Sequence, residues 1–156
     1  MNKNFIAGEW VDGDSAIENR NPSDISDLIG SYAQASTSQL ETALESARAA
    51  QKIWARTGLE ARQTALMHIG NSLMARADDL GELLSREEGK PRAEGRGEVY
   101  RAGQFFTYYA AEVLRQIGDN ADSVRPDIEI DVRRDPVGVV AVISPWNFPT
   151  ATAVWK

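Results

Sequence analysis

The sequence predicts an α/β fold that is incomplete within its 156 residues. Three consecutive stretches carry apolar residues at helical spacing, which is typical of amphipathic helices that pack in one layer. Residues 137–143 are then apolar at every position, as in a strand of a parallel sheet that helices cover on both faces. Such a strand needs parallel neighbours, and the sequence offers none. We therefore expect residues outside this chain to complete the sheet.

The composition excludes several classes of function. Lys and Arg total 17 against 23 Asp and Glu, and the net charge of −6 has the wrong sign for binding nucleic-acid phosphates. No stretch approaches the about 20 apolar residues of a transmembrane helix, and residues 1–10 lack the apolar core of a secretory signal. We therefore expect a cytoplasmic protein with no membrane partner. The chain has no cysteine, so it supplies neither disulfides nor a thiol nucleophile.

The first part of the chain predicts a small antiparallel β meander followed by a helix. Over residues 4–34, short β-type runs alternate with turn signals such as Asn21-Pro22. Ser38 and Glu41 then have the spacing of a capping box, and apolar residues recur at helical spacing as far as Trp54. We expect the helix to begin at this capping box.

Two more helical stretches follow. Gly58 is expected to end the first helix, and residues 60–88 repeat apolar residues at three- and four-residue steps, with a break predicted near Asp78-Asp79. Gly89 has the position of a left-handed C-cap. A further helix is predicted over residues 93–117.

The remaining residues predict two strands in different environments and the beginning of a helix. Residues 127–133 alternate charged side chains with Ile128, Ile130 and Val132, which indicates a half-buried strand of period two. The apolar run that follows predicts a strand buried on both faces. Pro149 suits the first position of a helix.

Residues 144–148 follow the expected carboxyl end of that buried strand, where open α/β sheets bind their ligands. Asn147 offers an uncharged amide donor between two prolines, which can stabilise an oxyanion without itself titrating. Pro145 and Trp146 present flat apolar surface suited to a cofactor. The alternative is that prolines and tryptophan simply form a tight strand-to-helix turn.

Residues 136–149, Pro-Val-Gly-Val-Val-Ala-Val-Ile-Ser-Pro-Trp-Asn-Phe-Pro, resemble the signature at the first cofactor-domain strand of the aldehyde dehydrogenase superfamily. The resemblance spans essentially the whole chain, and residues 21–27 with the Tyr-Tyr-Ala segment are most similar to the branch that oxidises α-ketoglutaric semialdehyde. Further matching stretches occur in order: Gly8-Glu9-Trp10, Asn21-Pro22, the alanine-rich helix ending at Trp54, Glu88-Gly89-Lys90-Pro91 and Tyr108-Tyr109-Ala110.

The resemblance implies three parts of an aldehyde-dehydrogenase-like α/β fold. Residues 1–117 would be the N-terminal part of a Rossmann-like cofactor-binding domain, with a β flap and three helices. Residues 118–136 would form antiparallel oligomerisation-arm strands, so the full-length protein would be a homo-oligomer, dimer or tetramer. Residues 137–156 would supply the first cofactor-domain strand, the Pro-Trp-Asn-Phe-Pro turn and the beginning of the next helix.

The resemblance also implies roles for single residues. Asn147 would be the side-chain donor of the oxyanion hole. One further set of residues would contact the cofactor, NAD or NADP: Ile143, Ser144, Pro145 and Trp146. Another set would line the aldehyde tunnel: Phe148, Thr152 and Trp155. In the family mechanism a cysteine thiolate attacks the aldehyde, hydride leaves for the nicotinamide, and a glutamate-activated water hydrolyses the thioester. The cysteine is missing, and the matching glutamate and lysine positions lie beyond this chain, so we expect the isolated chain to be inactive.

Two other residues are candidates for binding or catalysis. Arg101 lies in helical register with Phe105 and Tyr108 and matches a position that faces the tunnel mouth in similar enzymes, where a guanidinium can hold the far carboxylate of an acidic aldehyde. The alternative is an exposed helix arginine. His68, the only histidine, lies between helical core positions and is expected to be a partly buried packing residue, with no metal ligands around it.

Two function hypotheses follow. The first is an enzyme that oxidises a small aldehyde, such as α-ketoglutaric semialdehyde, with succinic semialdehyde or another small aldehyde as alternative substrates. The second is a non-catalytic fragment or subunit that assembles with a complementary chain.

Overall fold

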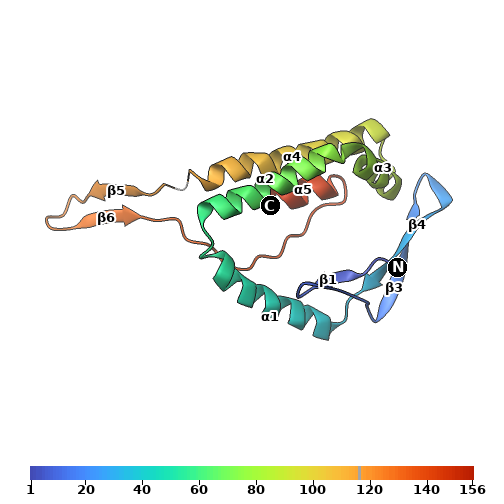
Figure 1. Cartoon of the computed structure of the whole chain (residues 1–156), viewed down its shortest axis with the longest axis horizontal. Helices are drawn as coiled ribbons and strands as arrows, with labels where there is room; N and C mark the ends of the chain where they lie inside the picture. Colours follow the sequence, from blue (N-terminus) through green and yellow to red (C-terminus); the bar gives the residue numbers. More distant parts are fainter. Residues whose placement is uncertain (116) are drawn as a thin grey trace.

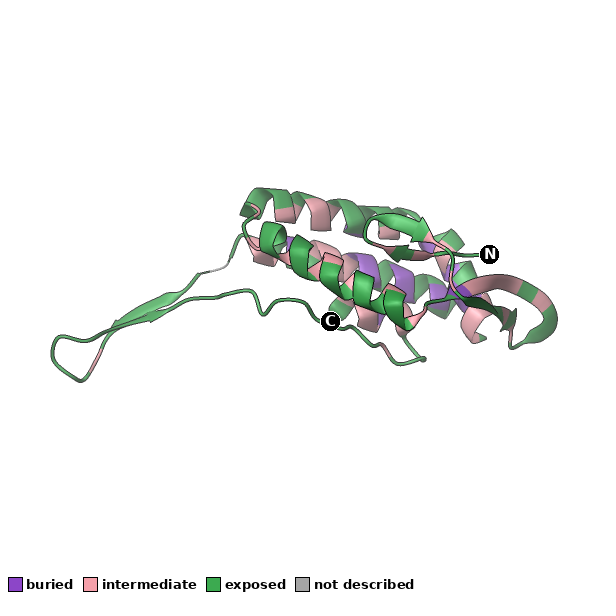
Figure 2. Cartoon of the chain, turned by 90° about the horizontal axis from the view of Figure 1, so that it is seen from below, coloured by how far each residue is buried: buried purple, intermediate pink, exposed green. Residues whose placement is uncertain are grey.

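The computed structural model describes residues 1–115 and 117–156. Its helices α2, α4 and α5 lie side by side in one layer, with α3 at one end, and the β5–β6 hairpin extends from the opposite end (Figure 1). Buried residues gather inside the helical layer, whereas the β5–β6 hairpin is exposed (Figure 2). The arrangement is α/β, as the sequence predicts, with small two-stranded sheets.

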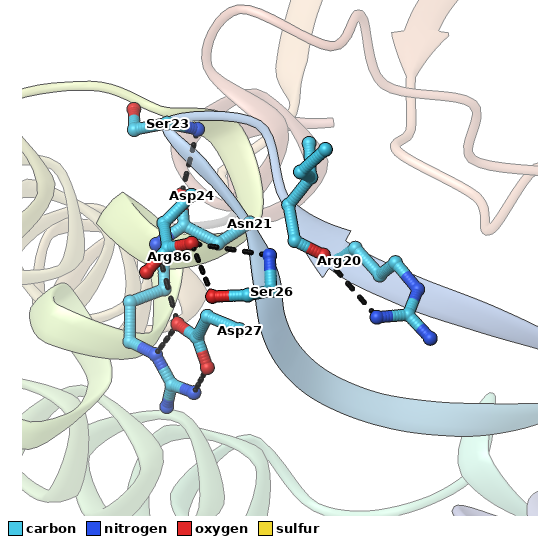
Figure 3. A network of polar contacts seen from close by, with 8 residues as sticks. Arg20, Asn21, Ser23, Asp24, Ser26, Asp27 and Arg86 are labelled. Carbon is cyan, nitrogen blue, oxygen red and sulfur yellow. Dashed lines mark hydrogen bonds and ion pairs between the residues drawn. The ribbon is translucent and has the colours of Figure 1, made fainter.

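The first 34 residues form two antiparallel hairpins, which confirms the expected meander. Strand β1 (Asn4–Ile6) pairs with β2 (Glu9–Val11), and β3 (Ser15–Asn21) pairs with β4 (Asp24–Gln34). Between β1 and β2, Ala7 and Gly8 both have positive φ, as a two-residue hairpin turn of type I′ requires. The turn between β3 and β4 is stabilised by side-chain hydrogen bonds of its own residues (Figure 3).

Helix α1 (Thr37–Trp54) begins two residues earlier than predicted, because its N-cap is Ser36 and not Ser38. Ser36 Oγ accepts from the backbone N–H of Gln39 at 3.1 Å, and Gln39 Oε1 accepts from the Ser36 N–H at 3.0 Å. The prediction of a box at Ser38 and Glu41 was therefore wrong. Both pairs fit the sequence pattern, and Gln39 also donates from its side chain to the Asp12 backbone oxygen at 2.7 Å, a contact between distant residues that supports the earlier pair.

The second helical stretch is divided into α2 (Leu59–Ala75) and α3 (Ala77–Glu88), which confirms the predicted break. It falls at Arg76, two residues earlier than expected, so that Asp78 and Asp79 lie in the first turn of α3, where acidic side chains are favourable. Gly89 has φ 84° and ends α3 in the left-handed conformation, as predicted.

The prediction that Gly58 ends the first helix was wrong: α1 ends at Trp54 with Ala55 as its C-cap, and Gly58 is the N-cap of α2. The carboxyl end of α1 is instead stabilised by Arg62. Its guanidinium donates to the backbone oxygens of Thr57 at 2.8 Å and Ala55 at 3.0 Å, which supplies partners for carbonyl groups beyond the helix.

Helix α4 (Arg92–Val113) lies at the centre of the packing, against α2, α3 and α5. Its buried Val99 contacts Ala77 and Leu84 of α3 in the main apolar cluster. Two glycines allow the close approach of α3 and α4: a Cβ on Gly95 would lie 2.5 Å from the Gly81 backbone oxygen. The helix ends four residues before the predicted Ile117, which is 76% exposed and has no apolar packing to extend the helix.

Strands β5 (Asp119–Asp122) and β6 (Glu129–Val132) form an antiparallel hairpin within the predicted arm. Its apolar side chains are only partly covered: Ile128 and Ile130 are each 47% exposed and Val132 is 48% exposed. No other element of the described chain packs on this face closely enough to bury it.

The predicted buried strand over residues 137–143 does not form. The segment runs unpaired from β6 to the last helix (Figure 1), and Val137, Val140 and Ile143 are 91%, 59% and 80% exposed. The described residues contain no strand that pairs with it. A segment that is apolar on both faces requires packing layers on both sides. In the described residues, no element covers either face of 137–143.

None of the helices in residues 1–115 and 117–156 combines the length and apolar character that crossing a bilayer requires.

Candidate active site

The turn over residues 144–148 leads into helix α5 (Pro149–Trp155), which begins where the sequence predicts. Pro149 occupies the first helical turn, where its missing N–H has no helical partner to lose. Phe148 precedes it with φ −141° and ψ 60°, outside the α region that proline disfavours for its neighbour. Local sequence therefore directs the chain into α5 immediately after Asn147.

Glu98 of α4 caps the beginning of α5. Its Oε1 accepts hydrogen bonds from the backbone N–H groups of Thr150 at 2.9 Å and Ala151 at 3.0 Å. Glu98 is only 5% exposed. The first N–H groups of a helix have no helical partner and carry partial positive charge, so a buried carboxylate is favourable at this place. Glu98 thus holds the first turn of α5 against α4.

Lys90, between α3 and α4, joins this cap to the turn before it. Its ammonium donates to Glu98 Oε2 at 2.5 Å and to the backbone oxygen of Asn147 at 3.0 Å. Glu88 Oε2 lies at 3.0 Å from the same nitrogen, and the Phe148 ring centroid lies at 4.6 Å. The side chains of Lys90 and Glu98 are 9% and 1% exposed, so their ion pair is buried.

The charge on Lys90 is favoured by these neighbours. Burial is the largest single influence on its pKa and acts to lower it, but the hydrogen bond to Glu98, the ion pair with Glu88 and the negative charges of both residues together outweigh burial. The pKa of Lys90 is therefore raised above its ordinary value. The ammonium stays protonated and the ion pair persists across the neutral range.

Asn147 combines an anchored backbone with an exposed side chain. Its carbonyl oxygen is held by Lys90, while the residue as a whole is exposed. Within the described residues its side-chain amide makes no hydrogen bond, so both amide N–H donors can bind a ligand. A neutral amide on an anchored backbone is suited to hydrogen-bond a developing negative oxygen.

The four residues expected to contact the cofactor form an open surface before this turn. Ile143 and Trp146 are 80% and 83% exposed, Pro145 is exposed and Ser144 is half-buried. Exposed apolar and planar side chains fit packing against a nucleotide. The phosphates would not fit at the beginning of α5, because Glu98 already occupies the Thr150 and Ala151 N–H groups and adds negative charge there.

A hollow of about 500 Å³ lies between α4 and the end of α5 and is lined by aromatic side chains and one arginine. Phe105 and Trp155 are in ring contact, with centroids 4.8 Å apart, and Tyr108 and Tyr109 meet edge to face at 5.2 Å. Arg101 is exposed at this hollow. An apolar wall with one guanidinium suits a small molecule that carries a carboxylate.

The structure brings two of the four predicted substrate residues together and places the other two elsewhere. Arg101 and Trp155 line the same hollow, whereas Phe148 and Thr152 are not among its lining residues. The Phe148 ring lies near Lys90, and Thr152 Oγ1 donates to the Phe148 backbone oxygen at 2.5 Å. A shared tunnel for all four residues remains a prediction.

The charged residues on the other helices form surface contacts. Asp78 pairs with Arg96 at 2.6 Å and Asp79 with Arg76 at 3.0 Å, all four side chains being more than half exposed. His68 is exposed on α2, so its prediction as a partly buried packing residue was wrong. The described residues contain no group of three His, Asp or Glu side chains placed to hold a metal ion.

Sequence reasoning missed the roles of Lys90, Glu98 and Glu88. Glu88, at the end of α3, has a side chain that is only 17% exposed and faces Lys90. The sequence did contain a signal: Glu98 lies at helical spacing with the small or apolar residues Gly95, Val99 and Ala102, so an acidic side chain stands on the buried face of α4. A charge at such a position requires a partner.

A known protein family matches nearly the whole chain. The model of the family described as "Aldehyde dehydrogenase family" matches residues 10–156. The chain belongs to the aldehyde dehydrogenase family. It is 39% identical to alpha-ketoglutaric semialdehyde dehydrogenase of Bacillus subtilis, over 98% of this chain and 32% of that protein. The enzyme of the same activity from Haloferax volcanii is 35% identical over 99% of this chain and 32% of its own length. This aldehyde dehydrogenase chain thus spans about a third of these relatives.

Solved structures agree with this chain in fold, and one of them is an aldehyde dehydrogenase by name. An NADP-dependent enzyme of Escherichia coli superposes with a TM-score of 0.92 at 34% identity, over 98% of this chain and 32% of that one. Betaine aldehyde dehydrogenase of Staphylococcus aureus, solved with NAD⁺, has a TM-score of 0.91 at 28% identity, over 100% of this chain and 32% of its own. The fold described above is therefore part of a larger aldehyde dehydrogenase fold.

Proposed function

We propose that this chain supplies the oxyanion donor and part of the cofactor and aldehyde surfaces of an NAD(P)-dependent aldehyde dehydrogenase. The observation that carries the proposal is the exposed Asn147 amide on a backbone held by Lys90 at 3.0 Å. Family membership over residues 10–156 supports it. The aldehyde would be oxidised to the carboxylic acid by an assembled enzyme, the polypeptide or complex that joins residues 1–156 to a cysteine-bearing segment.

The chemical role of this chain would be confined to binding and charge stabilisation. A cysteine thiolate from the other segment would attack the aldehyde carbon, and the carbonyl oxygen would take the electron pair of the broken π bond. The Asn147 amide would donate to that oxygen as it becomes negative. The nicotinamide, when bound, accepts the hydride that leaves this carbon, and water then releases the acid and restores the thiolate. Alone, the chain has no cysteine to act as this nucleophile and would be inactive.

The cofactor, NAD or NADP, would be held in part by Ile143, Ser144, Pro145 and Trp146. Their exposure leaves apolar surface for a nucleotide. The similar structures include an NADP-dependent enzyme and one solved with NAD⁺.

The substrate class we propose is a small aldehyde that carries a carboxylate, with α-ketoglutaric semialdehyde first. Arg101 at the aromatic hollow supplies a cation for the far carboxylate, and relatives named for this activity are 39% and 35% identical. Succinate-semialdehyde dehydrogenase of Acinetobacter baylyi is 36% identical, which keeps succinic semialdehyde as the alternative. Phe148, Thr152 and Trp155 would contribute further aldehyde contacts.

The β5–β6 hairpin would act as the oligomerisation arm of a cytoplasmic homo-oligomer. Its strands leave Ile128, Ile130 and Val132 about half exposed. A second copy that adds a strand or packs on this face would bury them.

A non-catalytic assembly role is the second candidate. The exposed apolar segment over residues 137–143 favours it, because this segment needs strands from another chain. Intact mass of the purified protein, with a search for a co-purifying cysteine-containing polypeptide, separates the two. A mass of 17.1 kDa with no second polypeptide and no turnover would support a chain that is not itself an enzyme.

The test of the proposed function is Asn147→Ala in the assembled enzyme. Loss of one oxyanion donor should lower kcat about 100- to 1,000-fold, measured as formation of reduced nicotinamide. The Kd of the cofactor should stay within twofold of wild type, about the scatter of such a comparison. An unchanged kcat would reject the role of Asn147.

A further inference from the structure

We propose that the buried Lys90–Glu98 ion pair positions the Asn147 amide for catalysis. The inference rests on the proposed function, since it assigns two positioning residues to the oxyanion donor. Neither residue contacts the reacting atoms in this proposal. Both act through the backbone that carries Asn147.

The first step in the argument is the placement of the contacts on both sides of one short segment. Lys90 Nζ holds the Asn147 carbonyl at 3.0 Å, and Glu98 Oε1 holds the Thr150 and Ala151 N–H groups at 2.9 and 3.0 Å. The remaining Glu98 oxygen joins the two anchors through Lys90 at 2.5 Å. The backbone from 147 to 151 is therefore restrained at both ends by one connected pair.

The second step is that helix capping alone does not account for the hydrogen bond from Lys90 to the Asn147 carbonyl. Glu98 already supplies an acceptor to the two N–H groups of α5, and Asn147 lies before the helix begins. A donor to the Asn147 carbonyl restrains the orientation of that peptide, and with it the direction in which the side chain leaves the backbone. The contact with the Phe148 ring at 4.6 Å adds a restraint on the next residue.

The third step is the cost of burying the pair. Lys90 and Glu98 are 9% and 1% exposed at their side chains, and removing two charges from water opposes folding even when they pair well. Replacing both partners of a buried ion pair with apolar side chains is often neutral or stabilising, whereas removing one partner alone destabilises. What the ion pair adds is geometry, because its hydrogen bonds are directional and reach three separate backbone groups. Catalysis by a hydrogen-bond donor depends on such geometry to within about 0.5 Å.

The experiment is a double-mutant cycle in the assembled enzyme. Glu98→Gln keeps an acceptor for the α5 N–H groups but removes the charge that holds Lys90, and Lys90→Met removes the donor to Asn147. We expect each to lower kcat about 10- to 100-fold, as for loss of a hydrogen bond to a charged group, with little change in the KM of the cofactor. In an Asn147→Ala background, each should change kcat less than about twofold, because coupled residues are non-additive.

Arg96→Met is the matched control. Arg96 lies on α4, two residues from Glu98, and the variant removes its ion pair with Asp78 of α3, where both side chains are more than half exposed. We expect kcat to change less than about twofold, as for other surface pairs. The fraction of functional sites is counted from the burst of reduced nicotinamide, so that misfolded enzyme does not enter kcat.

The positioning role would be overturned if Glu98→Gln and Lys90→Met lowered kcat by the same factor in the wild-type and Asn147→Ala backgrounds. Only a structural role would then remain. If Glu98→Gln gives no folded enzyme, Lys90→Met decides by the same cycle, because it leaves both Glu98 contacts to α5 in place. If Asn147→Ala itself leaves kcat unchanged, the proposed function fails; if it lowers kcat while the Lys90 and Glu98 variants do not, only the positioning role fails.

Discussion

Arg86 of α3 donates two hydrogen bonds to the carboxylate of Asp27 of β4, 2.9 Å from Nε to Oδ2 and 2.6 Å from Nη2 to Oδ1 (Figure 3). The two residues are 59 positions apart in the sequence. Asn21 donates to the same carboxylate at 3.2 Å. This contact joins the second hairpin to the helical layer.

Replacing Asp27 with Asn should lower the melting temperature at neutral pH and flatten its dependence on acid. The hydrogen bond from Arg86, followed by that from Asn21, holds the pKa of Asp27 below its ordinary value of 3.8. The stabilisation is therefore present above that value and is lost as pH falls through the lowered pKa. Thermal unfolding from neutral to strongly acidic pH measures it, with Glu18→Gln at an exposed pair as the control. A wild-type and Asp27→Asn difference that persists in strong acid would contradict the assignment.

Gly95→Ala should destabilise the chain by about 1 to 3 kcal/mol, the usual cost of forcing extra volume into tight packing. The added Cβ would lie 2.5 Å from the Gly81 backbone oxygen, so α3 and α4 must separate. Gly97→Ala is the matched control on the same helix, because nothing lies within 4 Å of its Cβ. It should stabilise by up to about 1 kcal/mol through helix propensity. Urea unfolding of both variants measures the change in the free energy of unfolding, which should have opposite signs for Gly95→Ala and Gly97→Ala.

Lys90→Met should destabilise the protein by an amount that is constant from neutral to moderately alkaline pH. Burial opposes the Lys90 charge, but Glu98 and Glu88 outweigh it and raise the pKa above the ordinary 10.5. The contribution of a raised pKa is complete below the ordinary value and is lost as pH rises through the raised one. Melting temperatures of wild type and variant should therefore converge only in strong alkali. Convergence near neutral pH would show that the ammonium is not held by these carboxylates.

Arg101→Ala in the assembled enzyme should raise the KM for α-ketoglutaric semialdehyde about 10- to 100-fold, the loss of a charge-assisted pair. An uncharged aldehyde of similar size should be unaffected. Arg101→Lys keeps the charge but not the forked geometry of the guanidinium. Its KM for α-ketoglutaric semialdehyde should therefore lie between those of wild type and Arg101→Ala. Equal KM changes for charged and uncharged aldehydes would remove Arg101 from substrate recognition and leave it as a surface arginine of α4.

Most of the helical layer could be predicted because its signals are local. The pairing of Pro149 with a helix start, Gly89 with a left-handed C-cap, and the break before α3 each depend on a few neighbouring residues. The capping residue of α1 could not be chosen locally, since two overlapping boxes fit and Gln39 also contacts Asp12. Residues 137–143 were predicted as a strand because their composition suits one, but pairing depends on neighbouring strands, and residues 1–115 and 117–156 contain none that pairs with this segment.

The candidate site divides in the same way. Asn147 was visible as an amide between two prolines, which is a local pattern. Lys90 contacts Asn147 from 57 positions away and Glu98 contacts Thr150 of α5 from 52 positions away, so tertiary packing is what brings them to the site. The family resemblance marked Lys90 within a motif without giving its contacts. Long-range polar contacts are thus what the structure adds to the site.

The unpaired valine-rich segment at 137–143 has a consequence for how the isolated polypeptide behaves in a test tube. An exposed segment of β-branched residues that pairs with no strand is a template for intermolecular strand addition. Copies of this chain would therefore associate as their concentration rises, and the solution would become turbid through aggregation before thermal unfolding begins. A cognate strand supplied in excess should keep the solution clear, which makes solubility itself an assay for the missing sheet.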